Sequence, residues 1–374
     1  MNISGWTRSR WDGDSGGPIW GLLLLFLAPA SWIYSAVMAL RPLLYFSGLM
    51  KRHRLGRPVI SIGNLTVGGT GKTPVTAFIA AILIKKGLKV TVLSRGYGGD
   101  LEGRCAVVSD GGPPLLGPEA CGDEPFMLAS SVPGISVVTG SDRYAAGLLA
   151  MERTSPDIFL LDDGFQHIRL HRDLDILLMD YQRPLGNGRV IPAGPLREPV
   201  SAVKRGDLLI YTRAPSDFRA AEMSAFTLPV CYAAYRISGF SRLETGEPAE
   251  VEEIRSCKVI AVTGIAGPDS FFNGLRATGI IPLTTLSLPD HEPYGPQAVD
   301  RLRLLALKHS AEFIIVTEKD AVKLKKQSGA GFPPVLVAGL ELRFSDTDLL
   351  NDLLDKLLSN ISGLRHNSRL SKEP

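Results

Sequence analysis

The chain has few cysteines and little net charge, and each scarcity excludes a class of protein. Its 374 residues include only four cysteines, which are Cys105, Cys121, Cys231 and Cys257. Their spacing contains none of the pairs that hold zinc or form a redox dithiol, so we expect reduced thiols in a cytosolic protein. The formal net charge of +3 is too small to indicate nucleic acid as the partner.

Formal charge is also nearly absent from residues 15–50, where Arg41 is the only charged side chain. The run 18–28 is as apolar as a membrane span, and tryptophans and tyrosines follow it. Basic residues then cluster at Lys51, Arg52, His53, Arg54 and Arg57. Aromatic and cationic residues of this kind settle at lipid headgroup depth. We therefore expect a membrane-associated helical segment at 18–50, preceded by a disordered extension at 1–17.

Residues 60–74 form an apolar strand, a glycine-rich turn and a helix start in succession, the layout of a phosphate-binding loop. Backbone N–H groups freed by the glycines can wrap a polyphosphate, Lys72 adds positive charge, and the Thr73 hydroxyl can ligate Mg²⁺. The strict pattern has Gly six residues before the Lys, where this chain has Thr66. A turn that binds nothing is the alternative, but it leaves Gly-Lys-Thr at a helix start unexplained. The predicted ATP-binding residues are Asn64, Thr66, Val67, Gly68, Gly69, Thr70, Gly71, Lys72 and Thr73.

Several arrangements of the apolar N-terminal segment remain open. Pro29 and Pro42 are expected to divide it into shorter helical pieces, which favours attachment at the membrane interface over a single span or a buried core helix. A signal peptide competes, because Arg8 and Arg10 precede the apolar run and residues 28–30 resemble a cleavage site. Export, however, would carry the phosphate loop away from cytosolic ATP.

The residues after the loop predict a parallel α/β sheet. A helix at 74–87 and a strand at 89–95 complete a strand–loop–helix–strand unit, and further strands are expected at 134–139, 157–161, 174–179 and 207–211. Ligands in such sheets gather at the carboxyl ends of strands. The fold class we expect is a P-loop NTPase-type domain plus a smaller α/β C-terminal domain, joined by a two-stranded linker.

Polar residues lie where that rule places a site. Asp162 and Asp163 follow an apolar strand, as the second Mg²⁺ contact does in P-loop enzymes, although an Asp-Gly turn with an extra surface Asp is the alternative. Asp123, before Glu124-Pro125 at a helix start, suggests by itself only an N-cap. The Gly- and Pro-rich stretch 186–199 is long for a loop inside such a domain, which favours a functional role.

Together these segments resemble the tetraacyldisaccharide 4′-kinase family of lipid A biosynthesis. The segments that carry the resemblance are residues 63–74, Leu93-Ser94-Arg95-Gly96-Tyr97-Gly98, Gly122-Asp123-Glu124-Pro125, Asp162-Asp163-Gly164-Phe165-Gln166-His167, residues 192–199, Pro289-Asp290-His291 and Val316-Thr317-Glu318-Lys319-Asp320. Thr66 is itself part of that family's loop.

The resemblance implies ATP-dependent transfer of the γ-phosphoryl group to the 4′-hydroxyl of a tetraacylated glucosamine disaccharide 1-phosphate. It implies a monotopic enzyme on the cytoplasmic face of the inner membrane of a Gram-negative bacterium, and we expect a monomer. Its partners are the acylated substrate and the lipid surface, with no nucleic acid.

The resemblance also assigns roles to residues. Asp123 pairs with His291, so that the carboxylate accepts the hydroxyl proton, and Lys72 neutralises the β/γ-phosphates. Mg²⁺ is held by Thr73, Asp162, Asp163 and Glu198, directly or through water. Contacts to the substrate or the nucleotide are assigned to Arg95, Tyr97, Arg143 and Arg197. If His291 works with Asp123, the active site lies between two domains that close on ATP.

The chain order predicts the remaining organisation. The nucleotide-binding domain occupies 51–230, a linker strand and turn 231–257, the C-terminal α/β domain 258–332, and a return strand and helix 333–360. Residues 361–374 are expected to be a mobile tail.

Two other functions compete with the lipid kinase. A membrane-bound regulatory or partitioning ATPase also has a Gly-Gly-x-Gly-Lys-Thr loop and a membrane helix, but it hydrolyses ATP alone and tolerates the loss of His291. A soluble small-molecule kinase leaves residues 18–50 unexplained.

Overall fold

The computed structural model describes residues 11, 18–215, 226–265, 267–289, 294–325 and 333–370. The chain divides into two compact units: an N-terminal unit of Met1–Ala233 with Phe344–Pro374, and a C-terminal unit of Ala234–Arg343. Both boundaries fall inside the stretches 231–257 and 333–360, which the sequence assigns to linkers.

A parallel sheet forms the centre of the N-terminal unit, as predicted. Its strands lie in the order β7-β6-β1-β5-β2-β4-β3, and β8 (Val230–Arg242) begins against β7. The bounds are β1 Val59–Asn64, β2 Val90–Ser94, β3 Ala106–Asp110, β4 Ser136–Thr139, β5 Ile158–Asp162, β6 Leu174–Asp180 and β7 Leu208–Thr212. Only β3 among these runs antiparallel, against β4. The phosphate-loop strand β1 therefore lies between β5 and β6.

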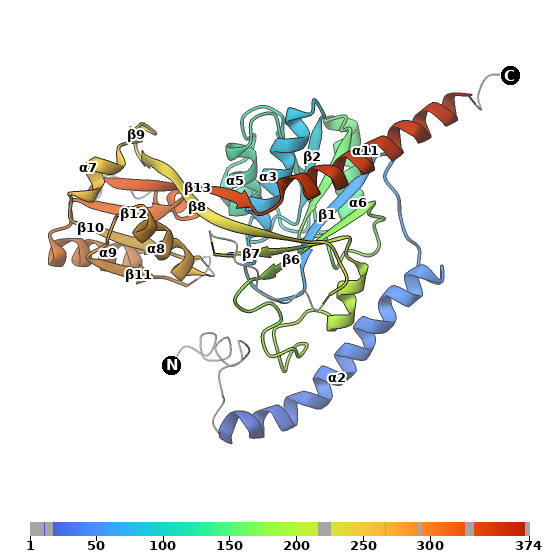
Figure 1. The fold of residues 1–374 in the computed structure, drawn as a ribbon, viewed down its shortest axis with the longest axis horizontal. Coiled ribbons are helices and arrows are strands. Elements are labelled where there is room, and N and C mark those ends of the chain that lie inside the picture. Colours follow the sequence, from blue (N-terminus) through green and yellow to red (C-terminus); the bar gives the residue numbers. More distant parts are fainter. Residues whose placement is uncertain are drawn as a thin grey trace. The chain divides into compact units, whose positions relative to one another are not determined.

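Helices cover this sheet, as Figure 1 shows. Helix α3 (Lys72–Lys85) packs on β1, β2 and β5, and α6 (Arg143–Arg153) packs on β2, β3 and β4. Asp142 starts α6 by accepting hydrogen bonds from the Tyr144 and Ala145 amides at 2.9 and 3.2 Å, a regular N-cap. The remaining elements are α4 Pro118–Cys121, α5 Asp123–Ser131, the 3₁₀ helix η1 Val200–Arg205 and α11 Thr347–Leu370. Helix α11 continues past residue 360, where the predicted return helix ends.

The N-terminal apolar segment is one continuous helix, α2 (Pro18–Phe46, 29 residues), with Pro29 and Pro42 inside it. The expected division into shorter pieces at the prolines is therefore wrong. A proline removes one backbone donor and bends a helix, but here contacts with the N-terminal unit persist on both sides of Pro42. Ser31, Arg41 and the buried Tyr45 make these contacts.

The C-terminal unit is a smaller parallel α/β layer. Its strands lie in the order β11-β10-β12-β13, followed by β8 and the short β9. The bounds are β9 Pro248–Ala249, α7 Val251–Arg255, β10 Val259–Thr263, α8 Pro268–Ala277, β11 Thr284–Ser287, α9 Pro296–His309, β12 Phe313–Thr317, α10 Glu318–Leu324 and β13 Val335–Phe344. Strands β8 and β13 are hydrogen-bonded neighbours, which confirms the predicted two-stranded linker.

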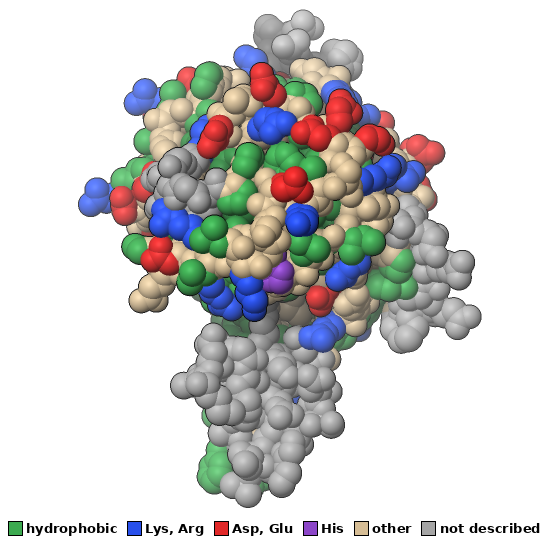
Figure 2. Space-filling model, turned by 90° about the vertical axis from the view of Figure 1, so that its left-hand side faces the viewer, with side chains coloured by type: hydrophobic (Ala, Val, Ile, Leu, Met, Phe, Trp, Pro, Cys, Tyr) green, Lys and Arg blue, Asp and Glu red, His purple; other side chains and the backbone are tan. Residues whose placement is uncertain are grey.

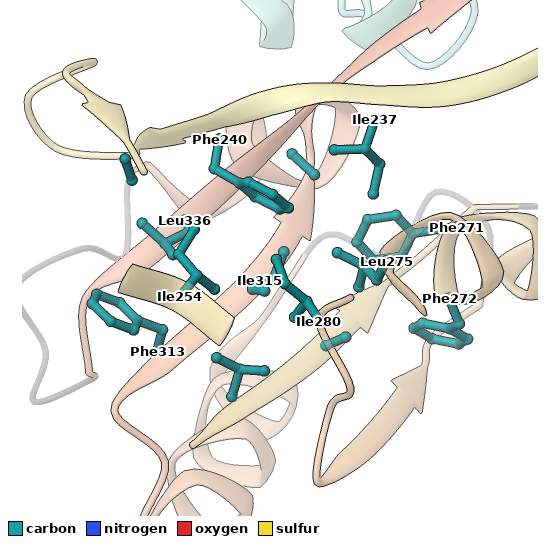
Figure 3. Packing of buried hydrophobic residues seen from close by; sticks show 14 residues of the cluster. Ile237, Phe240, Ile254, Phe271, Phe272, Leu275, Ile280, Phe313, Ile315 and Leu336 are labelled. Atoms are coloured by element: carbon teal, nitrogen blue, oxygen red, sulfur yellow. The ribbon is translucent and has the colours of Figure 1, made fainter. Parts of the chain in front are cut away.

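Apolar side chains from strands and helices close the core of this unit. Figure 3 shows Phe240 of β8, Leu275 of α8, Ile315 of β12 and Leu336 of β13 gathered in one cluster. Alternate residues of a strand point to opposite faces of the sheet. A second cluster, formed by the residues that alternate with those of the first, joins Ile260 and Val262 of β10 to α9. On the face drawn in Figure 2, side chains of both charges are interspersed with hydrophobic ones, in keeping with the small net charge.

Candidate active site

The phosphate loop leaves the buried strand β1 at Asn64 and enters α3 at Lys72. Gly68 and Gly71 have φ angles of 114° and 76°, which a side chain would disfavour. The Asn64 side-chain amide donates to the Thr66 hydroxyl at 3.3 Å and to the Gly68 carbonyl at 3.5 Å. On one flank the Val67 amide donates to the Pro195 carbonyl at 2.8 Å, and Thr66 bridges to Leu196. The conformation of the predicted loop thus depends on its glycines, and contacts with the 192–199 segment stabilise it.

Lys72 lies in a small ion network at the loop. Its ammonium group is 3.6 Å from Asp163 and donates to the Asn64 side-chain oxygen at 3.5 Å. Arg197 donates to both Asp163 oxygens at 2.9 Å and to the Gln166 side chain at 3.3 Å. Burial raises the pKa of Asp163, but the charges of Lys72 and Arg197 outweigh burial and leave that pKa below its ordinary value. The structure therefore joins four of the predicted site residues: Asn64, Lys72, Asp163 and Arg197.

Asp163 has a left-handed backbone, with φ of 55°. A non-glycine residue in this region costs about 1–2 kcal/mol. The turn places the Asp163 carboxylate toward Lys72 while Asp162 stays in the strand. Adjacent carboxylates of one Asp-Asp pair thus have different surroundings.

Asp162 ends β5 and is almost fully buried, with 3% of its surface exposed. Its carboxylate accepts a hydrogen bond from Thr76 of α3 at 3.3 Å. Burial, followed by the charge of Glu124, raises its pKa to about 7, and Lys72 opposes the shift. The raised pKa means that the positive charges near Asp162 do not compensate for its burial and for the neighbouring carboxylates.

These residues fit a Mg²⁺ ion shared with a nucleotide. The buried Thr73 hydroxyl and the Asp162 carboxylate both lie on elements that meet at the loop, α3 and β5. Among the residues that the structure describes, no group of three His, Cys, Asp or Glu side chains is placed to hold a metal. Mg²⁺ commonly takes only one or two carboxylates and completes its shell with phosphate oxygens and water.

Glu198 is engaged elsewhere. It is 1% exposed, and Arg205 donates to its two carboxylate oxygens at 2.9 and 2.8 Å. The Arg205 guanidinium also lies 4.6 Å from the Phe165 ring centroid. Arg205 therefore already uses acceptor sites on both Glu198 oxygens, and a metal held by Glu198 would share the carboxylate with that arginine.

The predicted substrate residues have contrasting surroundings. Arg143 is 4% exposed and donates to the carbonyls of Gly140 at 2.6 Å and Asp162 at 3.4 Å. Burial lowers its pKa to about 10. Arg95, paired with Glu102 at 3.5 Å, and Tyr97, 64% exposed, lie on the surface after β2. Arg143 thus supports the Asp162 backbone, whereas Arg95 and Tyr97 are accessible.

Asp123 is the first residue of α5 and follows Gly122, whose φ is 92°. An added Cβ at Gly122 meets the Tyr97 carbonyl at 2.7 Å, so the start of α5 lies close to the Arg95–Tyr97 segment. The neighbouring Glu124 acts electrostatically on Asp162. His291, like Asp290, lies outside the residues that the structure describes.

Several contacts at the site have no counterpart in the sequence prediction. Gln166 donates to the Asn64 carbonyl at 2.8 Å. Three side chains of α2 donate to carbonyls of the same loops: Ser31 to Val190 at 2.8 Å, Tyr34 to Arg197 at 3.0 Å and Arg41 to Gln166 at 3.1 Å. The spacing of 31, 34 and 41 on one helical face is the only sequence signal that could have indicated them.

The partly buried His167, which follows Gln166, should make the stability of the protein depend on pH. Burial lowers its pKa to about 4; the charged groups that act on it are Arg143, Asp142, Arg172 and Arg41. Between pH 6.5 and 4 the unfolded chain binds a proton here that the folded chain does not, so stability present above pH 6.5 is lost as pH falls.

We expect His167→Gln to reduce this acid sensitivity. Between neutral pH and pH 5 the titration of His167 lowers the free energy of unfolding of the wild type by about 2 kcal/mol. The variant lacks this titrating group and should not show that loss. Urea unfolding at pH 7.5 and pH 5 measures the difference, with His309→Gln in the other unit as the matched control. Equal losses in His167→Gln and wild type would contradict the assignment.

The parallel sheet, the loop from β1 to α3 and the carboxylate at the end of β5 define a P-loop nucleotide-binding enzyme. A family model described as tetraacyldisaccharide-1-P 4′-kinase matches residues 23–359. The chain belongs to this family and is a kinase.

Relatives agree along nearly the whole chain. Tetraacyldisaccharide 4′-kinase of Pelobacter propionicus is 48% identical over 90% of this chain and 93% of its own length. The protein of the same name from Geobacter sulfurreducens is 46% identical over 96% of this chain and 100% of its own. The solved structure of LpxK from Aquifex aeolicus, in complex with ATP, has a TM-score of 0.74 and 32% identity, and the match covers 90% of this chain and 99% of that one.

Proposed function

We propose that this kinase transfers the γ-phosphoryl group of ATP to the 4′-hydroxyl of a tetraacylated glucosamine disaccharide 1-phosphate in lipid A biosynthesis. The observation that carries the proposal is the arrangement of Lys72 at the end of a phosphate loop, with Asp162 and Asp163 beside it, in a chain of this family. Phosphoryl transfer requires mainly positioning and charge neutralisation, and these residues supply both.

In this proposal the loop amides and Lys72 bind the phosphates. Thr73 and Asp162 hold Mg²⁺, with Asp163 and Glu198 as further predicted ligands, directly or through water. When bound, the ion neutralises charge on the β- and γ-phosphate oxygens. Arg197 keeps Asp163 ionised and next to Lys72, since both cations lower the Asp163 pKa.

The substrate side is proposed from exposure and charge. Arg95 and Tyr97 are accessible beside the start of α5, so they contact the phosphate or the sugars of the substrate. Asp123 accepts the proton of the attacking hydroxyl, assisted by His291. Arg143 and Arg197 contribute by fixing Asp162 and Asp163.

We further propose that α2 lies in the cytoplasmic interface of the inner membrane and anchors a monotopic, monomeric enzyme. Leu24–Phe46 is long and apolar enough to cross a membrane. One face, however, is hydrogen-bonded to the N-terminal unit at Ser31, Tyr34 and Arg41. Large apolar side chains elsewhere on the helix are exposed, among them Leu25, Phe26, Trp32, Ile33, Val37, Leu40 and Leu43. A helix bound to protein on one side and apolar on the other suits the interface better than a span.

A charge on the apolar face of α2 should weaken membrane attachment. We expect Leu40→Glu to lower the fraction of protein that sediments with vesicles of anionic phospholipid about tenfold, because a carboxylate resists transfer into the acyl region. Leu148→Glu, on the exposed surface of α6, is the matched control and should bind as wild type does. Equal binding by all three proteins would show that attachment lies elsewhere.

A kinase assay tests the activity. Purified protein, labelled ATP and the acylated disaccharide 1-phosphate in detergent should yield a 4′-phosphorylated product. Hydrolysis of ATP without transfer to the lipid would instead favour a regulatory ATPase. Equal activity on a non-acylated sugar would favour a soluble small-molecule kinase.

A further inference from the structure

The phosphate loop is held on its second flank by residues that no motif includes. Strands β1, β6 and β7 lie side by side, and β7 ends at Thr212, followed by Arg213. The buried Thr212 hydroxyl donates to the Thr70 carbonyl at 2.8 Å, and the Met179 carbonyl, 3.3 Å away, is its more distant acceptor. The Arg213 guanidinium donates to the Gly69 carbonyl and forms an ion pair with Asp180 at the end of β6.

Arg213 is held in place by several partners. Its φ of 57° is a left-handed conformation that costs energy in a residue other than glycine. Asp180, its partner, accepts hydrogen bonds from the Gln182 and Arg183 amides at 2.9 and 3.3 Å through its other oxygen. The side chains of Arg213 and Asp180 are 19% and 18% exposed, so the ion pair is largely shielded from water. A strained residue held by several partners is typical of a functional position.

The two hydrogen bonds determine where loop amides point. In a trans peptide the C=O and the following N–H point in opposite directions. Holding the Gly69 carbonyl at Arg213 turns the Thr70 N–H away from β7, and holding the Thr70 carbonyl at Thr212 does the same for the Gly71 N–H. Successive amides that converge in this way form an anion-binding nest.

We propose that Thr212 and Arg213 are positioning residues that preorganise the Thr70 and Gly71 amides for the β- and γ-phosphates of ATP. They act through the two carbonyls rather than by touching the nucleotide, with Asp180 as the fixed anchor of Arg213. The inference rests on the proposed use of this loop for ATP. It adds contacts from the ends of β6 and β7 at Gly69 and Thr70 to those that the 192–199 segment makes at Thr66 and Val67.

Direct ATP binding to the full chain, without lipid substrate, tests this inference. We expect Thr212→Val and Arg213→Met each to raise the Kd of ATP about tenfold. The Kd of AMP, which lacks the outer phosphates, should stay within twofold of wild type. Thr212→Ser keeps the hydroxyl and should bind ATP as wild type does, and Arg153→Met, on the surface of α6, is the control for loss of an arginine.

The outcomes separate a positioning role from a structural one. An ATP Kd unchanged in Thr212→Val and Arg213→Met overturns the proposal, as does an equal weakening of ATP and AMP. If Arg213→Met fails to fold, the valine and serine variants at Thr212 decide the matter, because both nearly preserve its volume. Wild-type protein that binds ATP but leaves the acylated disaccharide unphosphorylated would refute the proposed function and not this one.

Discussion

Replacing Lys72 with methionine is expected to lower kcat about 10³-fold. Its ammonium group is one of the two cations next to Asp163 and stands at the first position of α3, where the bound phosphates are proposed to lie. Removal of one preorganised group that stabilises transition-state charge costs about 10²–10³ in turnover, and an arginine that stabilises the transition state of phosphoryl transfer can be worth more. Steady-state kinetics with saturating ATP and acylated disaccharide measures the loss.

The control for Lys72→Met lies on the same helix. Lys85 is exposed in the last turn of α3, so Lys85→Met removes an equal charge without touching the loop. It should retain wild-type turnover. A Lys72→Met enzyme within threefold of wild type would show that the loop lysine does not neutralise the transferring phosphate.

The sequence predicted the fold well where patterns are local. Strands β1 and β2 and helix α3 follow from apolar runs, glycine turns and a terminal Gly87, and the long β8 and β13 were predicted as a pair. Helix α6 and strand β3 were missed. The Arg143–Arg153 segment mixes alanine, glycine and charged residues, and its buried face consists largely of the small residues Ala146, Gly147 and Ala150, so it lacks the run of large apolar residues that indicates α3. Strand β3 has an irregular register against β4.

Only those site residues that belong to contiguous sequence motifs could be predicted from the sequence. The loop and the Asp162-Asp163 pair are contiguous in sequence, and their chemistry is implied by residue type. The partners of these groups come from distant segments: Arg205 on Glu198, Arg213 on Gly69 and Tyr34 on Arg197. The sequence around a single arginine does not indicate which carbonyl the side chain contacts, because that contact depends on the order of strands in the sheet. The predicted domain bounds and residue roles remain predictions.

Asp123 is the second position where a large effect is expected. We propose that its carboxylate accepts the proton of the 4′-hydroxyl as the bond to phosphorus forms, which a positioned base accelerates about 10²–10⁴-fold. Asp123→Asn keeps the size of the side chain and the start of α5 but removes the basic oxygen. We expect kcat to fall about 10³-fold while the Kd of ATP stays unchanged, with Glu152→Gln on the exposed surface of α6 as the matched control.

The predicted pairing of Asp123 with His291 is tested by combining substitutions. If the imidazole supports the carboxylate in one step, His291→Ala also lowers kcat by orders of magnitude, and the double variant loses little more than Asp123→Asn alone, since groups that act as a unit are not additive. Two independent roles instead give losses that multiply. Turnover unaltered in both single variants would refute the pair and return Asp123 to the helix-capping role that its sequence context alone suggests.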